Sequence, residues 1–188
     1  HNKDEINRLG IIIGDTVSVK RAGDVIPQII NYIPNLRPKV NKIISFPAYC
    51  PSCHSLLKIE DDEAIIRCVN SNECSDQVKG QLIHFVSRNA FNIEGLGEKQ
   101  IIELFDKKII KEPADIFLLN LDMKQEIKAK ILALEGWGVL SLSNIINSIN
   151  NAKIQPIEKI IYSLGIRHVG QGTACLLYTS DAADDSLR

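Results

Sequence analysis

The chain has 188 residues, of which 45% are hydrophobic and 24% charged, and 22 Lys and Arg face 23 Asp and Glu. This ordinary composition excludes wholesale disorder and a collagen-like repeat. The balanced charge excludes a strongly basic protein, so any nucleic-acid site must be local. Apolar runs such as Ile11–Ile13 are far too short for a membrane span, and we expect neither a span nor an export leader.

Both ends of the chain depart from the usual pattern. The sequence opens on His1 instead of Met, which predicts a fragment. Residues 175–188 lack the Ile-, Asn- and Lys-rich composition of the rest of the chain. They resemble a translation of sequencing-adaptor DNA, and a genuine acidic tail is the alternative. Without them 21 Lys and Arg face 20 Asp and Glu, which is still not basic. We therefore leave this tail out of the expected fold.

Residues 1–46 are predicted to be β structure. Thr16–Lys20 alternates with the period of two that is typical of a half-buried strand, after a turn signal at Gly14-Asp15. Val25–Ile33, interrupted by Pro27, is typical of an edge strand. Two or three strands do not make a stable domain by themselves. We expect the end of a small barrel whose beginning precedes His1.

Residues 79–174 have helical periodicity instead. Four amphipathic segments are predicted, at Gly80–Val86, Lys99–Phe105, Leu140–Ile149 and Ile157–Leu164. Short turns that contain glycine separate them. The predicted fold class is therefore multidomain α+β: a partial β-barrel, a small cysteine-rich segment at residues 47–78, and an all-α domain of stacked helical hairpins.

Four of the five cysteines lie in that middle segment, as Cys50-x2-Cys53 and, fourteen residues later, Cys68-x5-Cys74. A tetrahedral zinc ion takes four thiolates, and a C-x-x-C turn supplies two of them from one tight loop. Two disulfides or four buried thiols are the alternatives, but disulfides need an oxidising compartment. The spacing predicts a closed zinc site, which is structural because no coordination position stays vacant.

Three turns between the helices share one pattern of glycines and apolar residues. They are Phe91–Lys99 with Gly95 and Gly97, Leu134–Gly138 with Gly136 and Gly138, and Leu164–Gly170 as a looser copy. Glycine allows close approach of a backbone, and the helix that follows offers free amides to a DNA phosphate. A plain turn between packed helices is the alternative for any single copy. Three copies favour helix-hairpin-helix units.

The order of these parts resembles that of the bacterial NAD-dependent DNA ligases. The resemblance rests on the cysteine spacing and on runs from residue 1 to about 174. The runs are His1-Asn2-x-Asp4-Glu5-Ile6, Ile13-Gly14-Asp15-Thr16-Val17, Arg21-Ala22-Gly23-Asp24-Val25-Ile26-Pro27-Gln28, His84-Phe85-Val86-Ser87-Arg88, Ile93-x-Gly95-Leu96-Gly97 and Leu164-Gly165-Ile166-Arg167-His168-Val169-Gly170. The run from Arg21 to Gln28 is highly specific.

The resemblance implies an OB-fold barrel, a four-cysteine zinc finger and a helix-hairpin-helix domain that together encircle nicked duplex DNA. Such ligases seal 5′-phosphate/3′-hydroxyl nicks in replication and repair, through an enzyme-AMP and a DNA-adenylate intermediate, with NAD and Mg²⁺. Their reactive lysine sits in a K-x-D-G motif, which this sequence lacks. We expect no catalytic or NAD-binding residue here, with those domains before His1 and a fourth hairpin and BRCT domain after residue 174. The chain alone should not ligate.

The resemblance also implies residues that contact DNA. In the barrel these are Arg21, Val25 and Ile26, with a place in the core as the alternative for Val25 and Ile26. In the hairpins, the glycine turns themselves predict phosphate contacts, with a solvated turn as the alternative for Arg167. The residues are Gly95, Gly97, Gly136, Gly138, Arg167 and Gly170. Val139-Leu140 stands where the family usually has a lysine, which puts the phosphate contact of the second hairpin in doubt.

The implied partner is nicked duplex DNA bound without sequence preference, by a monomeric cytoplasmic protein at the bacterial nucleoid. A stand-alone zinc and hairpin scaffold for repair proteins is the alternative function.

Overall fold

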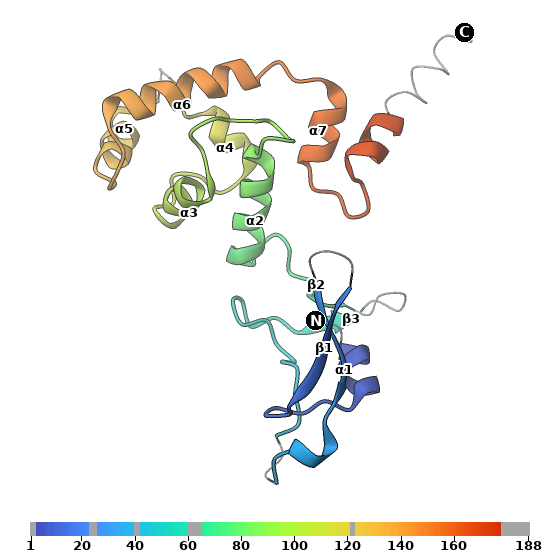
Figure 1. The fold of residues 1–188 in the computed structure, drawn as a ribbon. Helices are drawn as coiled ribbons and strands as arrows, with labels where there is room; N and C mark the ends of the chain where they lie inside the picture. Colours follow the sequence, from blue (N-terminus) through green and yellow to red (C-terminus); the bar gives the residue numbers. More distant parts are fainter. Residues whose placement is uncertain (1–2, 23–25, 40–41, 60–64, 121–122, 178–188) are drawn as a thin grey trace, which may run out of the picture. The chain divides into compact units, whose positions relative to one another are not determined.

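The computed structural model describes residues 3–22, 26–39, 42–59, 65–120 and 123–177 (Figure 1). The chain divides into two compact units, His1–Ser71 and Asn72–Arg188, and each is described by itself. In the part of the chain that is described, no helix is long and apolar enough to cross a bilayer.

The first unit begins with a helix that the sequence analysis did not predict. Helix α1 spans Lys3–Leu9, inside the region expected to be β structure, so that expectation was wrong for these residues. Its acidic residues lie in the first turn, and Arg8 in the last turn pairs with Glu5 at 2.6 Å. Both features favour a helix, through the macrodipole and the i,i+3 contact.

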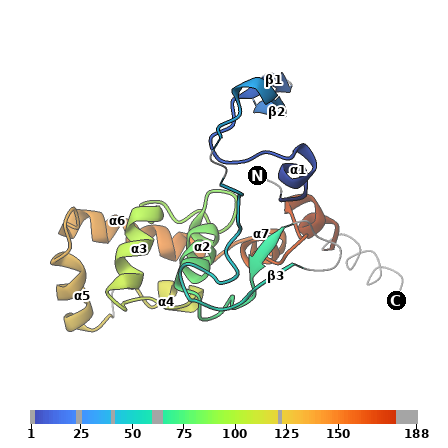
Figure 2. The same cartoon turned by 90° about the horizontal axis from the view of Figure 1, so that it is seen from below.

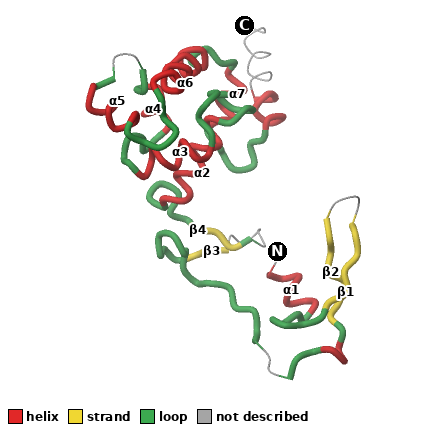
Figure 3. The backbone as a smooth tube through the Cα atoms, turned by 60° about the vertical axis from the view of Figure 1, so that its left-hand side comes forward, coloured by secondary structure: helices red, strands yellow, loops and turns green. Residues whose placement is uncertain are grey.

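The two predicted strands are present as one antiparallel hairpin, β1 (Val17–Ala22) and β2 (Ile26–Tyr32) (Figure 3). A register shift between Ser18 and Val19 marks a bulge. A short 3-10 turn, Pro34–Leu36, follows β2. Val25 and the tail residues 178–188, which the sequence analysis also discussed, lie outside the described residues.

An ion pair holds the two ends of this hairpin region together. The Asp15 carboxylate accepts hydrogen bonds from Arg37 Nε (2.8 Å) and Nη2 (2.7 Å), and from the Ile12 amide (3.0 Å). The Arg37 guanidinium also lies 3.7 Å from the centre of the Tyr32 ring and donates to the Gly10 carbonyl. The side chain of Asp15 is 1% exposed. Bidentate geometry of this kind fixes the orientation of both partners.

Arg37→Ala should raise the pKa of Asp15. The hydrogen bond from Arg37 holds that pKa below its ordinary value in the folded chain, with a smaller lowering from the Ile12 amide. Because the folded pKa is the lower one, the contact stabilises the fold fully above the ordinary aspartate pKa and is lost as the pH falls through the folded pKa. NMR titration of the Asp15 carboxyl should give a higher midpoint in the variant than in the unaltered chain. An unchanged midpoint would contradict this.

The second unit is helical, with α2 (Ser75–Val86), α3 (Glu98–Asp106), α4 (Pro113–Phe117), α5 (Gln125–Leu132), α6 (Val139–Ala152) and α7 (Ile157–Ser163). A further helical segment covers residues 171–177. The predictions for α3, α6 and α7 are confirmed to within a few residues. Helix α2 begins before residue 79, and α4 and α5 were not predicted.

One apolar core joins these helices. Leu82, Ile101, Leu104, Ile116, Ile131, Leu142 and Ile149 are almost fully buried in it. Seen from below, α2, α3, α4 and α6 lie around this core, with α5 at its end (Figure 2). Trp137, 6% exposed, packs in this core and donates from Nε1 to a Glu103 carboxylate oxygen at 2.9 Å. Burial of this apolar surface provides the main stabilisation of the unit.

Candidate zinc centre and nucleic-acid interface

The first two cysteines lie in a tight backbone loop. The Cys50 amide donates to the Ser55 carbonyl (2.8 Å), and the His54 amide donates to the Cys50 carbonyl (2.9 Å). His54 takes a positive φ of 57°, which lets the chain reverse directly after Cys53. The loop therefore turns the Cys50 and Cys53 side chains toward the same point.

The other two cysteines lie at the ends of regular elements. Strands β3 (Leu57–Ile59) and β4 (Ile66–Cys68) form a short antiparallel pair in which Cys68 lies opposite Leu57. Cys74 is the N-cap residue of α2, and its carbonyl accepts from the Val78 amide at 2.9 Å. Helix α2 thus begins directly at a cysteine, which is why it starts earlier than its apolar periodicity predicts.

All four sulfur atoms lie within 4.8 Å of one another. Zn–S bonds of about 2.3 Å in a tetrahedron place the sulfurs roughly 3.8 Å apart. Cys53 Sγ and Cys68 Sγ are 3.5 Å apart, close to that spacing and well beyond the S–S bond of a disulfide. The donor set therefore fits one zinc ion with no vacant position. Such a site is structural and activates no water.

Two polar neighbours that the sequence analysis did not single out lie beside Cys53. The Ser55 hydroxyl is 3.3 Å from its sulfur, and Asn70 Nδ2 donates to the Ser55 oxygen at 3.3 Å. The contact with Ser55 lowers the pKa of Cys53 to about 6. The Asn70 amide acts to lower the pKa of Cys68, but burial and the neighbouring cysteines outweigh it and raise that pKa to about 11. A thiolate at Cys53 is the form that a metal ion binds.

The glycine turns of the second unit share one backbone geometry. In each, the fourth residue donates to the carbonyl of the first: Leu96 to Ile93 (3.3 Å), Trp137 to Leu134 (3.2 Å) and Val169 to Ile166 (3.0 Å). In each, the fifth residue is a glycine whose carbonyl accepts the first bond of the next helix: Gly97 (3.0 Å), Gly138 (3.0 Å) and Gly170 (2.9 Å). We call these runs turn one (Ile93–Gly97), turn two (Leu134–Gly138) and turn three (Ile166–Gly170).

The third residue of each turn takes a positive φ. It is Gly95 (88°) in turn one, Gly136 (82°) in turn two and His168 (65°) in turn three. The sequence analysis described this turn as a looser copy, but its backbone geometry is the same, with His168 in the place of the glycine. Ile166, Val169 and Gly170 have the same spacing as the first, fourth and fifth residues of turns one and two, and this spacing is the sequence signal that identifies turn three.

The exposed parts of the turns are the glycines and the helix starts. Gly95, Gly97, Gly136, Gly138, Arg167 and Gly170 are all exposed. The fourth residue of each turn lies between the residue with the positive φ and the final glycine. In turns one and two this residue is apolar and buried, as Leu96 and Trp137. Turns one and two are thus fixed by their buried apolar residue, and all three turns present backbone to solvent.

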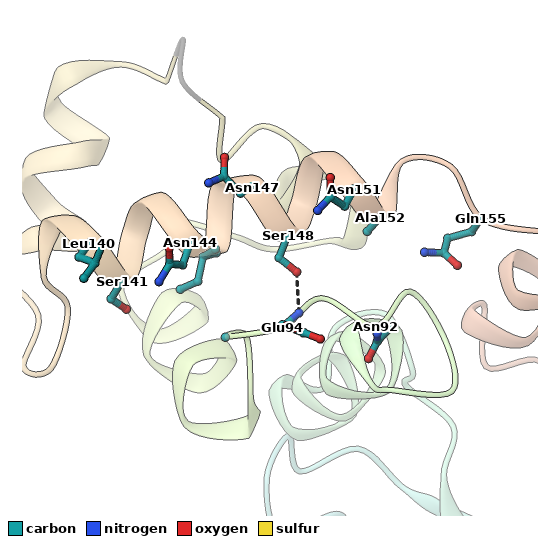
Figure 4. Close-up of a pocket in the computed structure, with 12 residues that line it drawn as sticks. Asn92, Glu94, Leu140, Ser141, Asn144, Asn147, Ser148, Asn151, Ala152 and Gln155 are labelled. Carbon is teal, nitrogen blue, oxygen red and sulfur yellow. Dashed lines mark hydrogen bonds between the residues drawn. The ribbon is translucent and has the colours of Figure 1, made fainter.

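A groove of about 820 Å³ lies along α6 beside turn one (Figure 4). Its wall on α6 is uncharged and mixes polar side chains with the apolar Leu140, Ile145 and Ala152; the polar ones are Ser141, Asn144, Asn147, Ser148 and Asn151. The Glu94 amide donates to Ser148 Oγ at 2.7 Å, which joins turn one to this helix. Among the described residues that line the groove, Glu94 is the one ionisable residue.

The predicted contacts in the barrel lie near the tip of the β1–β2 hairpin. Arg21 pairs with Pro27 and Ala22 with Ile26 in the register, and Arg21 and Ile26 are exposed. Ile26 is 66% exposed, so it is not a core residue of this unit. Val25 lies outside the described residues.

Two segments in the first half of the chain match known domains. Residues 1–41 match the NAD-dependent DNA ligase OB-fold domain, and residues 49–75 match the NAD-dependent DNA ligase C4 zinc finger domain. The chain is 43% identical over 177 residues to the DNA ligase of Shewanella frigidimarina (strain NCIMB 400), a match that covers 94% of the chain. The chain spans about a quarter of the length of that curated relative (25%). Residues 1–41 and 49–75 are therefore similar to the OB-fold domain and the C4 zinc finger of the NAD-dependent DNA ligases.

Proposed function

We propose that this chain is the DNA-binding portion of an NAD-dependent DNA ligase and holds nicked duplex DNA by its phosphates. The observation that carries this proposal is the backbone geometry shared by turns one, two and three. Each turn has an exposed glycine as its fifth residue and leads into a helix start, and turn three adds the exposed Arg167. The free amides there suit phosphate oxygens and read no base sequence.

The other parts of the chain have supporting roles in this proposal. Arg21, Val25 and Ile26 contact DNA near the nick, the arginine by its charge. Cys50, Cys53, Cys68 and Cys74 hold one structural zinc ion. The adenylation lysine and the NAD and Mg²⁺ sites belong to other domains of the enzyme, because the chain has no K-x-D-G motif. The protein acts as a monomer at the bacterial nucleoid.

Binding of labelled duplex DNA, measured by fluorescence anisotropy across a salt series, tests this proposal. Because phosphate contacts release counterions, the affinity should fall steeply and log-linearly with salt, and equally for unrelated sequences. A nicked duplex should bind at least as tightly as an intact one. Binding that ignores salt, or that follows one sequence, would contradict the proposal.

Leu140→Lys should strengthen duplex binding. Leu140 occupies in α6 the place that Lys99 occupies in α3, two residues after the glycine N-cap. It is 75% exposed, so the substitution leaves no cavity. We expect the affinity at low salt to rise about three- to tenfold and the salt slope to steepen by about one.

Ile154→Lys is the matched control for this gain. Ile154 is 90% exposed and follows the opposite end of α6, so this variant adds the same charge away from turn two. If both variants strengthen binding equally, the gain reflects net charge alone and turn two makes no phosphate contact.

A further inference from the structure

Ser55 contacts both cysteines of the first pair. Its carbonyl accepts the Cys50 amide at 2.8 Å, and its hydroxyl oxygen lies 3.3 Å from Cys53 Sγ. Its backbone amide also donates to the Cys53 sulfur. Ser55 is half-buried and directly follows His54, where the loop reverses. One residue therefore holds the backbone of Cys50 and the sulfur of Cys53.

Asn70 has the matching place in the loop of Cys68. It follows Cys68 by two residues, the same spacing that separates Ser55 from Cys53, and its backbone amide donates to the Cys68 sulfur. Its side chain reaches the other loop, where Nδ2 donates to Ser55 Oγ at 3.3 Å. A hydrogen bond between side chains 15 positions apart thus joins the two cysteine loops. We call the path from Asn70 Nδ2 through Ser55 Oγ to Cys53 Sγ the relay.

Metal binding fixes the direction of the relay. A zinc ion binds cysteine as a thiolate, which has no proton to donate. The Ser55 hydroxyl is then the donor and the Cys53 sulfur is the acceptor. A hydroxyl has one proton and rotates to suit its partners. Because Asn70 already donates to the Ser55 oxygen, the hydroxyl proton is left for the sulfur.

We propose that Ser55 and Asn70 are positioning residues of the zinc centre, and that Asn70 acts through Ser55. The Ser55 hydroxyl orients the Cys53 thiolate and stabilises its negative charge, which strengthens zinc binding. Residues that hydrogen-bond to metal ligands commonly have this effect. The inference rests on the four-cysteine zinc site of the proposed function and adds two residues that do not touch the metal.

The zinc affinity of the full chain, measured by competition with a chromophoric chelator, tests the relay. We expect about tenfold weaker binding for Ser55→Ala and about threefold weaker binding for Asn70→Ala, which keeps its backbone amide. Because Asn70 acts through Ser55, the double variant should bind no more weakly than Ser55→Ala alone. Losses that multiply in the double variant would show two independent effects and overturn the relay.

Two further variants control for the substitution itself. Ser45→Ala removes a hydroxyl from an exposed residue outside the matched zinc finger segment, and it should bind zinc as the unaltered chain does. Ser55→Thr keeps the hydroxyl and should bind zinc nearly as tightly as the unaltered chain. If Ser55→Thr loses as much affinity as Ser55→Ala, the hydroxyl is not the group that matters and the inference is wrong.

Cobalt(II), loaded in place of zinc, separates the hydrogen bond from the shape of the site. Its ligand-field bands report the tetrahedral geometry, and its sulfur-to-metal charge-transfer band reports the electron density on the thiolates. In Ser55→Ala the charge-transfer band should move to longer wavelength, because a thiolate that lacks a hydrogen bond gives up an electron more easily. The ligand-field bands should keep their position and intensity. Weakened ligand-field bands, or a charge-transfer band that does not move, would overturn the inference.

The zinc measurements also separate this inference from the function on which it rests. If Ser55→Ala binds zinc as tightly as Ser45→Ala while the unaltered chain binds one zinc ion, the relay is wrong but the zinc site stands. If the unaltered chain binds no zinc, both fail.

Discussion

Cys53→Ser is expected to abolish zinc binding and to unfold residues 49–75. This segment has little core of its own: β3 and β4 have three residues each, and Leu56, Ile59, Ile65 and Val69 are each at least half exposed. A segment so small depends on the metal for its stability, and structural zinc contributes about 10–16 kcal/mol in isolated zinc fingers. Loss of one thiolate removes most of that stabilisation. Zinc content by mass spectrometry and amide hydrogen exchange of β3 and β4 measure the effect.

Cys175→Ser is the matched control. Cys175 is exposed and takes no part in the four-sulfur cluster. This variant should keep one zinc ion per chain and the same exchange rates as the unaltered protein. Equal zinc loss in both variants, or one zinc ion retained with slow exchange in Cys53→Ser, would show that the cluster is not the metal site.

Gly95→Ala is expected to be the most destabilising change among the glycine turns. Gly95 has a φ of 88°, and a Cβ there would lie 2.8 Å from Ile145 Cγ1 in the core. The variant therefore suffers both backbone strain and a clash, for which we expect a loss of about 2–4 kcal/mol in the free energy of unfolding. Trp137, the one tryptophan of the chain, is buried in the same unit. Its fluorescence during urea unfolding reports on this unit specifically.

Gly136→Ala separates the effect of backbone strain from the effect of the steric clash with Ile145. Gly136 has nearly the same φ, 82°, but no atom lies within 4 Å of the Cβ position. We expect a loss of only about 1–2 kcal/mol, which is the cost of the left-handed conformation alone. If the two variants unfold at the same urea concentration, Ile145 yields to the added methyl group and does not fix turn one. Duplex affinity measured on the folded variants then shows whether turn geometry and DNA binding change together.

The sequence predicted the elements that have a clear periodicity and missed those that rest on local contacts. Helices α3 and α6 follow from their apolar spacing, and β1 follows from its alternation. Helix α4 has five residues, too few for a periodic pattern, and begins because Glu112 and Asp115 form a capping box with Pro113 at the first turn. Helix α1 buries no residue, so no apolar face identified it. The charge pattern at its ends was the available signal.

The candidate site was predictable where chemistry depends on residue type and spacing. Four thiols at this spacing leave few alternatives to zinc, whereas Ser55 and Asn70 beside Cys53 depend on the fold of the loop. Likewise the glycines identified turns one and two, but His168 in turn three takes a conformation that residue type alone does not indicate.

Nick sealing by a chimeric enzyme tests the central claim most directly. In the chimera, residues 1–174 of this chain replace the matching quarter of the curated relative, and sealing of a nicked duplex is measured with NAD and Mg²⁺. We expect the chimera to seal nicks, and the same chimera with Cys53→Ser to lose that activity while it still forms the enzyme-AMP intermediate. A zinc-loaded chimera that forms enzyme-AMP but binds and seals no nicked DNA would contradict the claim that this chain is the DNA-binding portion of a ligase.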